Sequence, residues 1–373
     1  MYIIQRLIGV SIYSIVLLIV CNLLAITSKK DHGKILFFYN VLLFIMAYNF
    51  IPVPGNDLFR LFDTLHFYGS KNIKEIIDVM TSTATPTNAL YFYLIGKFNN
   101  ESLLPAITSA IFFRNIFYII KDYSTRNNIK SNNVSIALFF FMSTGVYFEV
   151  ISGIRTMLGF SIVAVCMYNE YIKKKSLTRN IIWYLLAGFL HPAVLAIILI
   201  RILYLLRQNS NNKIRNILIV LLVLIFGIIY GDKFINAMIE KAFEYTTSKN
   251  KFSYLGEYIV GAIKITIIFI IQYLNRKSNR RKDIDSGIID LINIINIISV
   301  LVIGVSFFEY NTFYRFLIFN SIIFIPVLMS SLNLNLAKIK NIARLKRIVI
   351  TLSILMLIIE CTRGNLCSLK FFI

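Results

Sequence analysis

Long apolar runs separated by short polar loops fill the chain from end to end. A helix that crosses the hydrocarbon core of a membrane needs about 20 predominantly apolar residues. Windows of that length predict ten spans, at 4–25, 35–52, 104–121, 134–150, 154–172, 216–230, 258–274, 286–304, 312–331 and 348–360. The pattern therefore predicts an all-α polytopic membrane protein with about ten transmembrane helices, in one integral-membrane domain over residues 1–373.

One further apolar segment, 181–206, is interrupted in its middle by Gly188, His191 and Pro192. Proline removes a backbone donor and disfavours helix in the residue before it. We expect two half-helices that meet near His191 as a hairpin; the alternative is one long, kinked span. Irregular backbone at membrane depth is tolerated only beside protein or a wet cavity, so both interpretations put His191 near a cavity.

Composition supports the membrane assignment and changes the meaning of the charge. The 373 residues are 57% hydrophobic and only 15% charged, whereas a soluble domain has about 25% charged residues. The net charge of +21 would suggest nucleic acid as a partner of a soluble protein. Here the basic residues gather in short loops between apolar runs, which is typical of the positive-inside bias.

The loop charges orient the chain. Lys and Arg are enriched in six loops, Ser28–Lys34, Lys121–Lys130, Lys173–Arg179, Arg207–Arg215, Arg276–Lys282 and Lys338–Arg347. We expect these loops in the cytoplasm. The loop 53–103 has four basic and five acidic residues, and 231–257 has four of each, so both are predicted outside. A short membrane-associated helix is expected within 53–103, and both termini are expected outside.

Arg155 lies in the otherwise apolar stretch FEVISGIRTMLGFSIVAVCMY. A charge near the bilayer interior costs about 2.5–3.5 kcal/mol on insertion scales, so it generally serves an anionic substrate, a pathway or an ion pair. Glu149 stands six residues earlier, and a structural Glu149–Arg155 pair is one alternative. The other is an anion site, because a guanidinium stays ionised and matches phosphate oxygens.

Asp57 and Arg60 follow the second predicted span. On a helix that starts near Asn56 they share a face, because residues three apart are neighbours there. One interpretation makes Asn56 the N-cap and Asp57 an acid favoured by the helix dipole. The other makes Asp57 a carboxylate at the mouth of a cavity, available as a general base.

Two more candidates face the same side of the predicted topology. Arg315 begins the span 312–331, with Glu309 six residues earlier. His191 beside Pro192 is either a hydrogen-bonded buried histidine or a donor to phosphate or sugar. No acidic or Cys/His cluster with metal-ligand spacing is present in the sequence, and no cofactor motif, so neither is expected.

In their order and membrane setting, these residues resemble the EpsG-type branch of the Wzy-like polysaccharide polymerases. The residues that carry the resemblance stand in four motifs: GNDLFR (Asn56, Asp57, Arg60), SGIRTMLGFSIV (Arg155), AGFLHPAVLAIIL (His191) and YNTFYRFLIF (Arg315). It covers about residues 35–330. One departure is the Thr-Met-Leu-Gly that follows SGIR, where a more alanine-rich turn is expected.

The resemblance implies a multi-pass glycosyltransferase of the bacterial inner membrane that joins undecaprenyl-diphosphate-linked repeat units at the periplasmic face. It would make O-antigen, capsule or exopolysaccharide, with a chain-length regulator as a further partner. As a mechanism, Arg155 and Arg315, with Arg60, would hold the donor diphosphate, and His191 would orient diphosphate or sugar. Asp57 would deprotonate the acceptor hydroxyl, with Glu149 as the second candidate base.

Two rival functions use similar residues. A flippase for lipid-linked oligosaccharide would also place arginines in a cavity, but it predicts internal repeats and cationic residues in both leaflets. A membrane acyltransferase that modifies the polysaccharide predicts a catalytic histidine in an early loop, where the chain has only His66. The collection of cationic residues on one side favours the polymerase.

Overall fold

The chain folds into a bundle of α-helices, seen in a computed structural model that describes residues 2–52, 57–208, 255–279, 286–306, 310–333, 342–362 and 365–371. The helices among these residues are α1 (Tyr2–Ile26), α2 (His32–Tyr48), α3 (Asp57–Ser70), α4 (Ile73–Ser82), α5 (Pro86–Gly96), α6 (Leu103–Arg126), α7 (Ser131–Met142), α8 (Val146–Ser152), α9 (Ile154–Tyr171), α10 (Ile181–Gly188), α11 (Pro192–Gln208), α13 (Leu255–Asn279), α14 (Ser286–Ser306), α15 (Tyr310–Asn333) and α16 (Ile342–Thr362). The predicted all-α class is confirmed.

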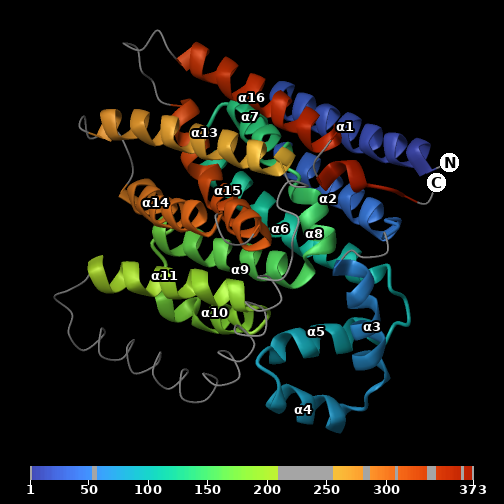
Figure 1. The fold of residues 1–373 in the computed structure, drawn as a ribbon. Helices are drawn as coiled ribbons and strands as arrows, with labels where there is room; N and C mark the ends of the chain where they lie inside the picture. The colour runs from blue at the N-terminus through green and yellow to red at the C-terminus, as the bar shows by residue number, and fades with distance from the viewer. Residues whose placement is uncertain are drawn as a thin grey trace.

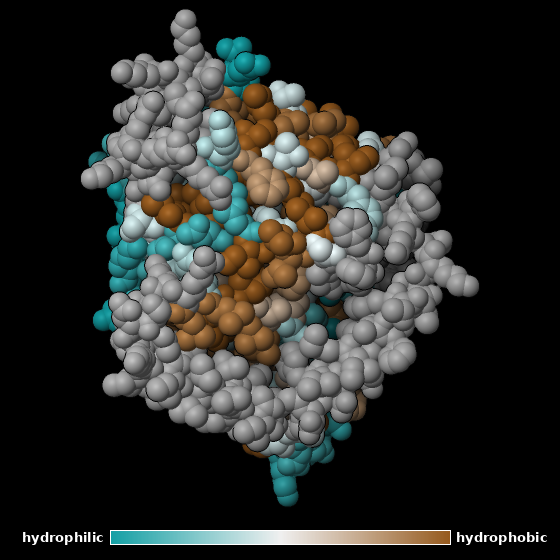
Figure 2. All heavy atoms as spheres, turned by 60° about the vertical axis from the view of Figure 1, so that its left-hand side comes forward, coloured by the Kyte–Doolittle hydropathy of each residue, from teal (hydrophilic) through white to brown (hydrophobic). Residues whose placement is uncertain are grey.

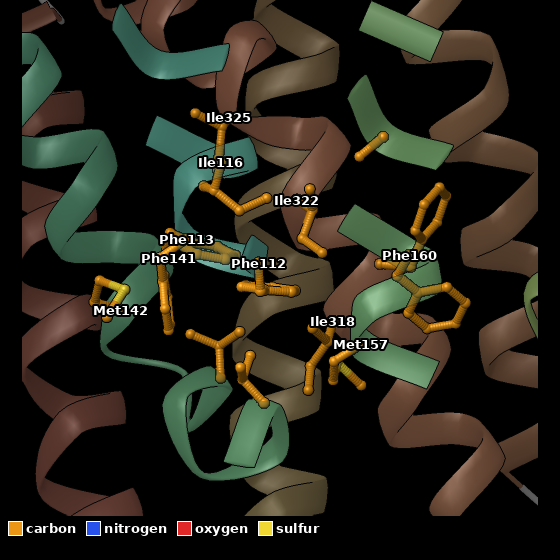
Figure 3. Packing of buried hydrophobic residues seen from close by; sticks show 14 of the residues in the cluster. Phe112, Phe113, Ile116, Phe141, Met142, Met157, Phe160, Ile318, Ile322 and Ile325 are labelled. Atoms are coloured by element: carbon orange, nitrogen blue, oxygen red, sulfur yellow. The ribbon is translucent and has the colours of Figure 1, made fainter. Parts of the chain in front are cut away.

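Helix α15 forms the centre of the bundle. In its apolar part 83% of the residues are buried, against 33% in α1. It packs against α7, α9, α13 and α14, and the core is built from large side chains of these helices and α6. Figure 3 shows Phe112 and Phe113 of α6, Phe141 of α7 and Phe160 of α9 around Ile318, Ile322 and Ile325 of α15.

Large hydrophobic side chains also cover the outside of the bundle, as expected for helices in contact with lipid. Phe37 and Phe38 of α2, Leu203 of α11 and Val300 of α14 are each 64% to 68% exposed. The space-filling view shows hydrophobic residues across the middle of one face, with hydrophilic residues at its left edge and lower tip (Figure 2). The protein is therefore a membrane protein.

Fewer helices qualify as spans than the ten predicted. Among the described residues, Gln5–Ile26, Leu103–Arg126, Ser286–Gly304 and Phe313–Asn333 are long and apolar enough, and the bent pair α7–α8 makes a fifth. The other predicted spans are shorter, as in α2, or carry several charges, as in α16. The predicted span 216–230 and nearly all of the loop 231–257 lie outside the described residues.

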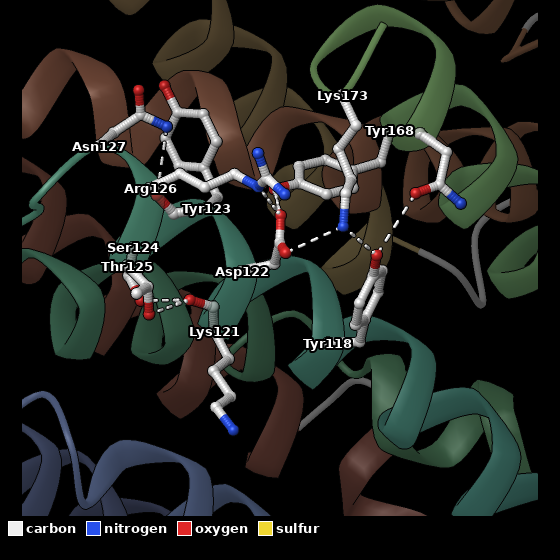
Figure 4. Close-up of polar contacts among 11 residues, drawn as sticks. Tyr118, Lys121, Asp122, Tyr123, Ser124, Thr125, Arg126, Asn127, Tyr168 and Lys173 are labelled. Carbon is white, nitrogen blue, oxygen red and sulfur yellow. Dashed lines mark hydrogen bonds and ion pairs between the residues drawn. The ribbon is translucent and has the colours of Figure 1, made fainter. Parts of the chain in front are cut away.

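Three of the six loops predicted in the cytoplasm, Ser28–Lys34, Lys121–Lys130 and Lys173–Arg179, lie together at one end of the bundle, which we call the basic end; much of the other three lies outside the described residues. Lys29 is hydrogen-bonded to Asn128, so the first two basic loops touch. Asp122 of α6 accepts from Lys173 at 3.0 Å, and from Tyr168 of α9 at 2.7 Å (Figure 4). These contacts support the predicted grouping of the loops.

The opposite end carries both chain termini, and we call it the site end. Residues 365–371 return to it, where Phe50 and Phe371 form a β-bridge and Ile51 N donates to Lys370 O at 2.9 Å. Helices α3, α4 and α5 form a small unit beside this end (Figure 1). This outer unit replaces the single short helix that was predicted for the loop 53–103.

The interrupted segment 181–206 is a hairpin of α10 and α11, as predicted. The guanidinium of Arg201 lies 5.5 Å from the centre of the Tyr184 ring, although 17 positions separate the two residues. A straight helix would place them about 25 Å apart. Glu170 of α9 pairs with Arg201, and both side chains are about 95% buried. This ion pair attaches the hairpin to α9.

The predicted span 134–150 is wrong in one respect, because it is broken into α7 and α8, which are bent by 53°. Ser143 and Thr144 turn their hydroxyls back onto the carbonyls of Phe139 and Phe141, at 2.7 Å each. Gly145 then adopts φ +67°, which favours glycine. A hydropathy window does not register such a break, since every residue in it is compatible with burial.

The outer unit depends on a close contact between Gly69 of α3 and Gly96 of α5. A Cβ on Gly96 would lie 2.7 Å from Gly69 Cα. We expect Gly96→Val to separate α3 from α5, costing about 1–3 kcal/mol, and to increase proteolysis within residues 57–96. Gly304→Ala is the control, because nothing lies within 4 Å of a Cβ there. Equal protease resistance of both variants would contradict this packing.

The Glu170–Arg201 pair should be purely structural. Arg201→Met leaves a buried carboxylate without its counter-charge, and we expect a loss of about 3–5 kcal/mol in the free energy of unfolding. The double variant Glu170→Gln/Arg201→Met should recover part of the loss, since no charge then remains. Thermal unfolding in detergent measures both. Equal losses in the single and double variants would show that the charge is not the cause.

Candidate functional site

Asp57 is the centre of an ion cluster at the site end. It is the first residue of α3, where a carboxylate is favoured by the helix dipole. Arg60, one turn later, donates to Oδ1, and Arg315 of α15 donates to Oδ2 at 2.9 Å. The predicted shared face of Asp57 and Arg60 is confirmed. The proposed N-cap Asn56 lies outside the described residues, as does Glu309.

Arg155 joins this cluster from a third helix. It is the second residue of α9, and its side chain is partly buried. Its strongest electrostatic neighbours are Arg315 and Asp57, followed by Tyr68 and Arg60. Of the carboxylates, Asp57 is the one that acts most on Arg155.

Exposure differs among the arginines in a way that suits ligand binding. The Arg60 side chain is 68% exposed, whereas that of Arg315 is 16% exposed and that of Asp57 40%. Arg315 is thus fixed among protein atoms, while Arg60 reaches the surface. An arriving anion would meet the flexible guanidinium first and the fixed one behind it.

The arginines weaken Asp57 as a base. Burial alone would raise the pKa of this carboxyl, but the guanidiniums of Arg315 and Arg60 outweigh that effect and hold the pKa below its ordinary value. Asp57 is therefore ionised at neutral pH and accepts protons poorly. A bound anion that draws Arg315 away would remove this effect.

Glu149 lies next to the cluster on the short helix α8. Gly153 N donates to the Glu149 carbonyl at 2.7 Å and closes α8, directly before α9 begins. A Cβ on Gly153 would be 3.5 Å from Glu149 Oε2, so the carboxylate lies over the glycine. Arg315 and Asp57 act electrostatically on Glu149. The three arginines and two carboxylates together have at least one excess positive charge.

His191 lies at the tip of the α10–α11 hairpin. Its Nδ1 accepts from Ala193 N at 3.2 Å, which caps the start of α11 and places the proton of the neutral ring on Nε2. The tip packs on Gly159 of α9, where a Cβ would be 2.6 Å from Val194 Cγ2. Since Gly159 is one turn from Arg155, His191 is at a similar depth, but on another element. The hydrogen bond that the structure describes for the His191 side chain is thus a helix cap.

Sequence reasoning missed two groups near the cluster. Tyr68 of α3 is an electrostatic neighbour of Arg155. A buried group of Lys264, Tyr314 and Glu360 lies behind Glu149. Lys264 in an apolar run was a visible signal for the second group, but its partners come from α15 and α16, which no spacing in the sequence relates to it. No metal-binding group of three or more His, Cys, Asp or Glu side chains occurs in the described ranges.

Comparison with known proteins agrees with the membrane architecture. A model of the EpsG family matches residues 66–370. The chain belongs to the EpsG family. Neither a curated protein nor a solved structure matches it significantly. Membership makes it a polysaccharide polymerase-like membrane protein, of a family associated with glycosyltransferase-like activity. The matched range includes Glu149, Arg155, His191 and Arg315, whereas Asp57 and Arg60 precede it.

Asp57 should compete with external anions for Arg315 and Arg60. We expect Asp57→Asn to bind inorganic pyrophosphate about tenfold more tightly at low salt, because a charge-assisted hydrogen bond contributes about 1.5–3 kcal/mol. Titration calorimetry measures the affinity, and the gain should shrink as salt screens it. Asp63→Asn, an exposed acid on the same helix, is the control. An unchanged affinity in Asp57→Asn would contradict the competition.

Proposed function

We propose that this protein joins lipid-linked oligosaccharide repeat units into a polysaccharide by glycosyl transfer, with an undecaprenyl diphosphate as the donor's carrier. The observation that carries the proposal is the meeting of Arg60, Arg155 and Arg315 around Asp57, from three separate helices. Guanidinium groups match the paired oxygens of a diphosphate, and they stay ionised in a partly buried site.

In the proposed reaction, an acceptor hydroxyl attacks the anomeric carbon of the donor sugar. A glycosidic bond forms, the bond to the diphosphate oxygen breaks, and its electron pair leaves with the diphosphate. Negative charge therefore develops on the leaving group. Arg155 and Arg315, held in advance by the fold, stabilise that charge, which is where preorganised donors are most effective. Arg60, being more exposed, receives the diphosphate.

The proton of the acceptor hydroxyl goes to a carboxylate. Asp57 is the weaker candidate while two guanidiniums hold it, because its lowered pKa makes it a poor base. Glu149 lies beside the arginines on a separate helix, and we assign it the role of base. Asp57 then serves as the anion that occupies the arginines between turnovers. We also assign to His191, at the hairpin tip, the role of orienting the sugar.

We further propose that the site end faces the periplasm of a bacterial inner membrane. The support is the gathering of three Lys- and Arg-rich loops at the opposite end, which the positive-inside rule places in the cytoplasm. The donor and the acceptor are then both lipid-linked glycans in the outer leaflet. A protein that regulates chain length is a further expected partner. The proposal includes no metal or other cofactor.

Arg155→Ala or Arg315→Ala should abolish polymer formation. Loss of one transition-state donor costs about 10²–10³ in turnover, so cells with either variant should carry glycan of a single repeat unit. Gel analysis of the glycan measures this, with protein quantity checked by immunoblot. The control is Arg114→Ala, an exposed arginine in α6, which should leave long chains.

Two outcomes would contradict the proposal. Long-chain polymer with Arg155→Ala or Arg315→Ala at normal protein quantity would remove the arginines from the reaction. Retention of lipid-linked repeat units on the cytoplasmic side, with no single-repeat product outside, would indicate a flippase instead.

A further inference from the structure

The break between α7 and α8 is surrounded by three buried polar side chains from distant parts of the chain. Lys264 of α13 and Glu360 of α16 are both 0% exposed, and Tyr314 of α15 is 1% exposed or less. Helices α13, α15 and α16 pack on one another on this side of the bundle (Figure 1). An ionisable residue buried in a membrane protein is expensive and generally has a function.

Two of the three side chains, Lys264 and Tyr314, bond to the carbonyl of Thr144, which has no helical partner at the break, and Glu360 joins the group through Tyr314. Lys264 Nζ donates to Thr144 O at 3.3 Å, and Tyr314 Oη lies 2.9 Å from the same oxygen. Tyr314 Oη is also 2.9 Å from Glu360 Oε1, and Lys264 Nζ lies 5.1 Å from the centre of the Tyr314 ring. The group thus satisfies a backbone carbonyl that lipid could not.

Gly145 lets the carboxylate of Glu360 approach the break. A Cβ at Gly145 would be 2.5 Å from Glu360 Oε2 and 2.6 Å from Tyr314 Oη, closer than real Cβ contacts. The bend of 53° between α7 and α8 therefore has two causes, the left-handed glycine and the buried charges packed against it. Together they set the direction in which α8 leaves the break.

The direction of α8 matters because α8 carries Glu149. Arg315 and Asp57 of the cluster, and Glu360 and Lys264 of the buried group, all act electrostatically on Glu149. Glu149 is thus the link between the buried group and the arginine cluster. Simple stability does not require charges here, since well-packed hydrophobic residues in place of a buried ion pair are often as stable or more so.

We propose that Lys264 and Glu360 are positioning residues, which hold the α7–α8 break so that the Glu149 carboxylate faces the arginine cluster. The inference rests on the proposed function, in which Glu149 accepts the proton of the acceptor. It predicts an effect on turnover rather than on donor binding, because the arginines that hold the diphosphate belong to α3, α9 and α15. Tyr314 is a poor test residue, since it neighbours Arg315.

A double-mutant cycle of Lys264→Met and Glu149→Gln tests the coupling in the full-length protein in liposomes, with a synthetic lipid-diphosphate-linked oligosaccharide as substrate. We expect Lys264→Met to lower kcat about 10–100-fold and to change KM for the donor less than about twofold. In the Glu149→Gln background the same change should lower kcat less than about twofold, because the group to be positioned is already lost.

Glu360→Gln is the second variant, because glutamine keeps the shape and the acceptor for Tyr314 while it removes the charge. It should behave like Lys264→Met, and Lys264→Arg should restore part of kcat. Equal losses from Lys264→Met in both backgrounds would overturn the positioning role, as would a loss confined to KM. Failure of both variants to insert in the membrane would make the pair a requirement of folding and would also overturn it.

Arg315→Ala separates this inference from the function on which it rests. If Arg315→Ala stops polymer formation while Lys264→Met and Glu360→Gln retain the wild-type kcat, only the positioning role fails. If Arg315→Ala forms long chains, the proposed function itself fails.

Discussion

The ion pair between Asp57 and Arg315 connects the outer unit of α3, α4 and α5 to the middle of the bundle. The two residues are 258 positions apart, and few other contacts join α3 to the bundle. Arg315 belongs to α15, the most enclosed of the spans, so the pair attaches a peripheral unit to the most rigid element. An anion that takes over Arg315 would therefore both occupy the cluster and release one attachment of this unit.

Buried charges at the two ends of the bundle are satisfied in different ways. Toward the basic end, Arg201 gives two hydrogen bonds to Glu170, and Asn180 gives that carboxylate a third. The charges of Arg201 and Glu170 therefore cancel, and the carboxylate has its hydrogen bonds filled. At the site end, three arginines share Asp57 and the neighbouring Glu149, which leaves at least one excess positive charge. A site that lacks one negative charge attracts an anion, and a complete pair does not.

The sequence was sufficient for features that depend on local spacing or composition. Pro192 and His191 inside an apolar run predicted the hairpin, and the three-residue spacing of Asp57 and Arg60 predicted their contact. The common side of the arginines followed from loop charges. The break at residues 143–145 was not predictable in the same way, because Ser143, Thr144 and Gly145 are all common inside transmembrane helices.

Contacts between distant helices were also beyond sequence reasoning. Nothing near Glu360 in the chain indicates that it meets Tyr314, which in turn donates toward the Thr144 carbonyl, since the three residues belong to distant parts of the chain. Fewer spans qualify among the described residues than were predicted, for a related reason. Hydropathy detects apolar segments, but it does not distinguish a helix that crosses the membrane from a short one that packs beside its neighbours, such as α2.

The two carboxylates of the site have opposite requirements, and the fold meets them on different elements. Asp57 must be able to give up its guanidiniums to a diphosphate, which suits the exposed start of a peripheral helix. A base must instead keep one position through the reaction, which suits α8, enclosed between a left-handed glycine and the start of α9. If Asp57 were the base, each arriving diphosphate would have to raise the proton affinity of the Asp57 carboxylate. It would also have to leave that carboxylate in the same position. Assigning the proton to Glu149 removes that conflict, because the anion that Arg315 gives up and the base that the reaction needs are then separate groups.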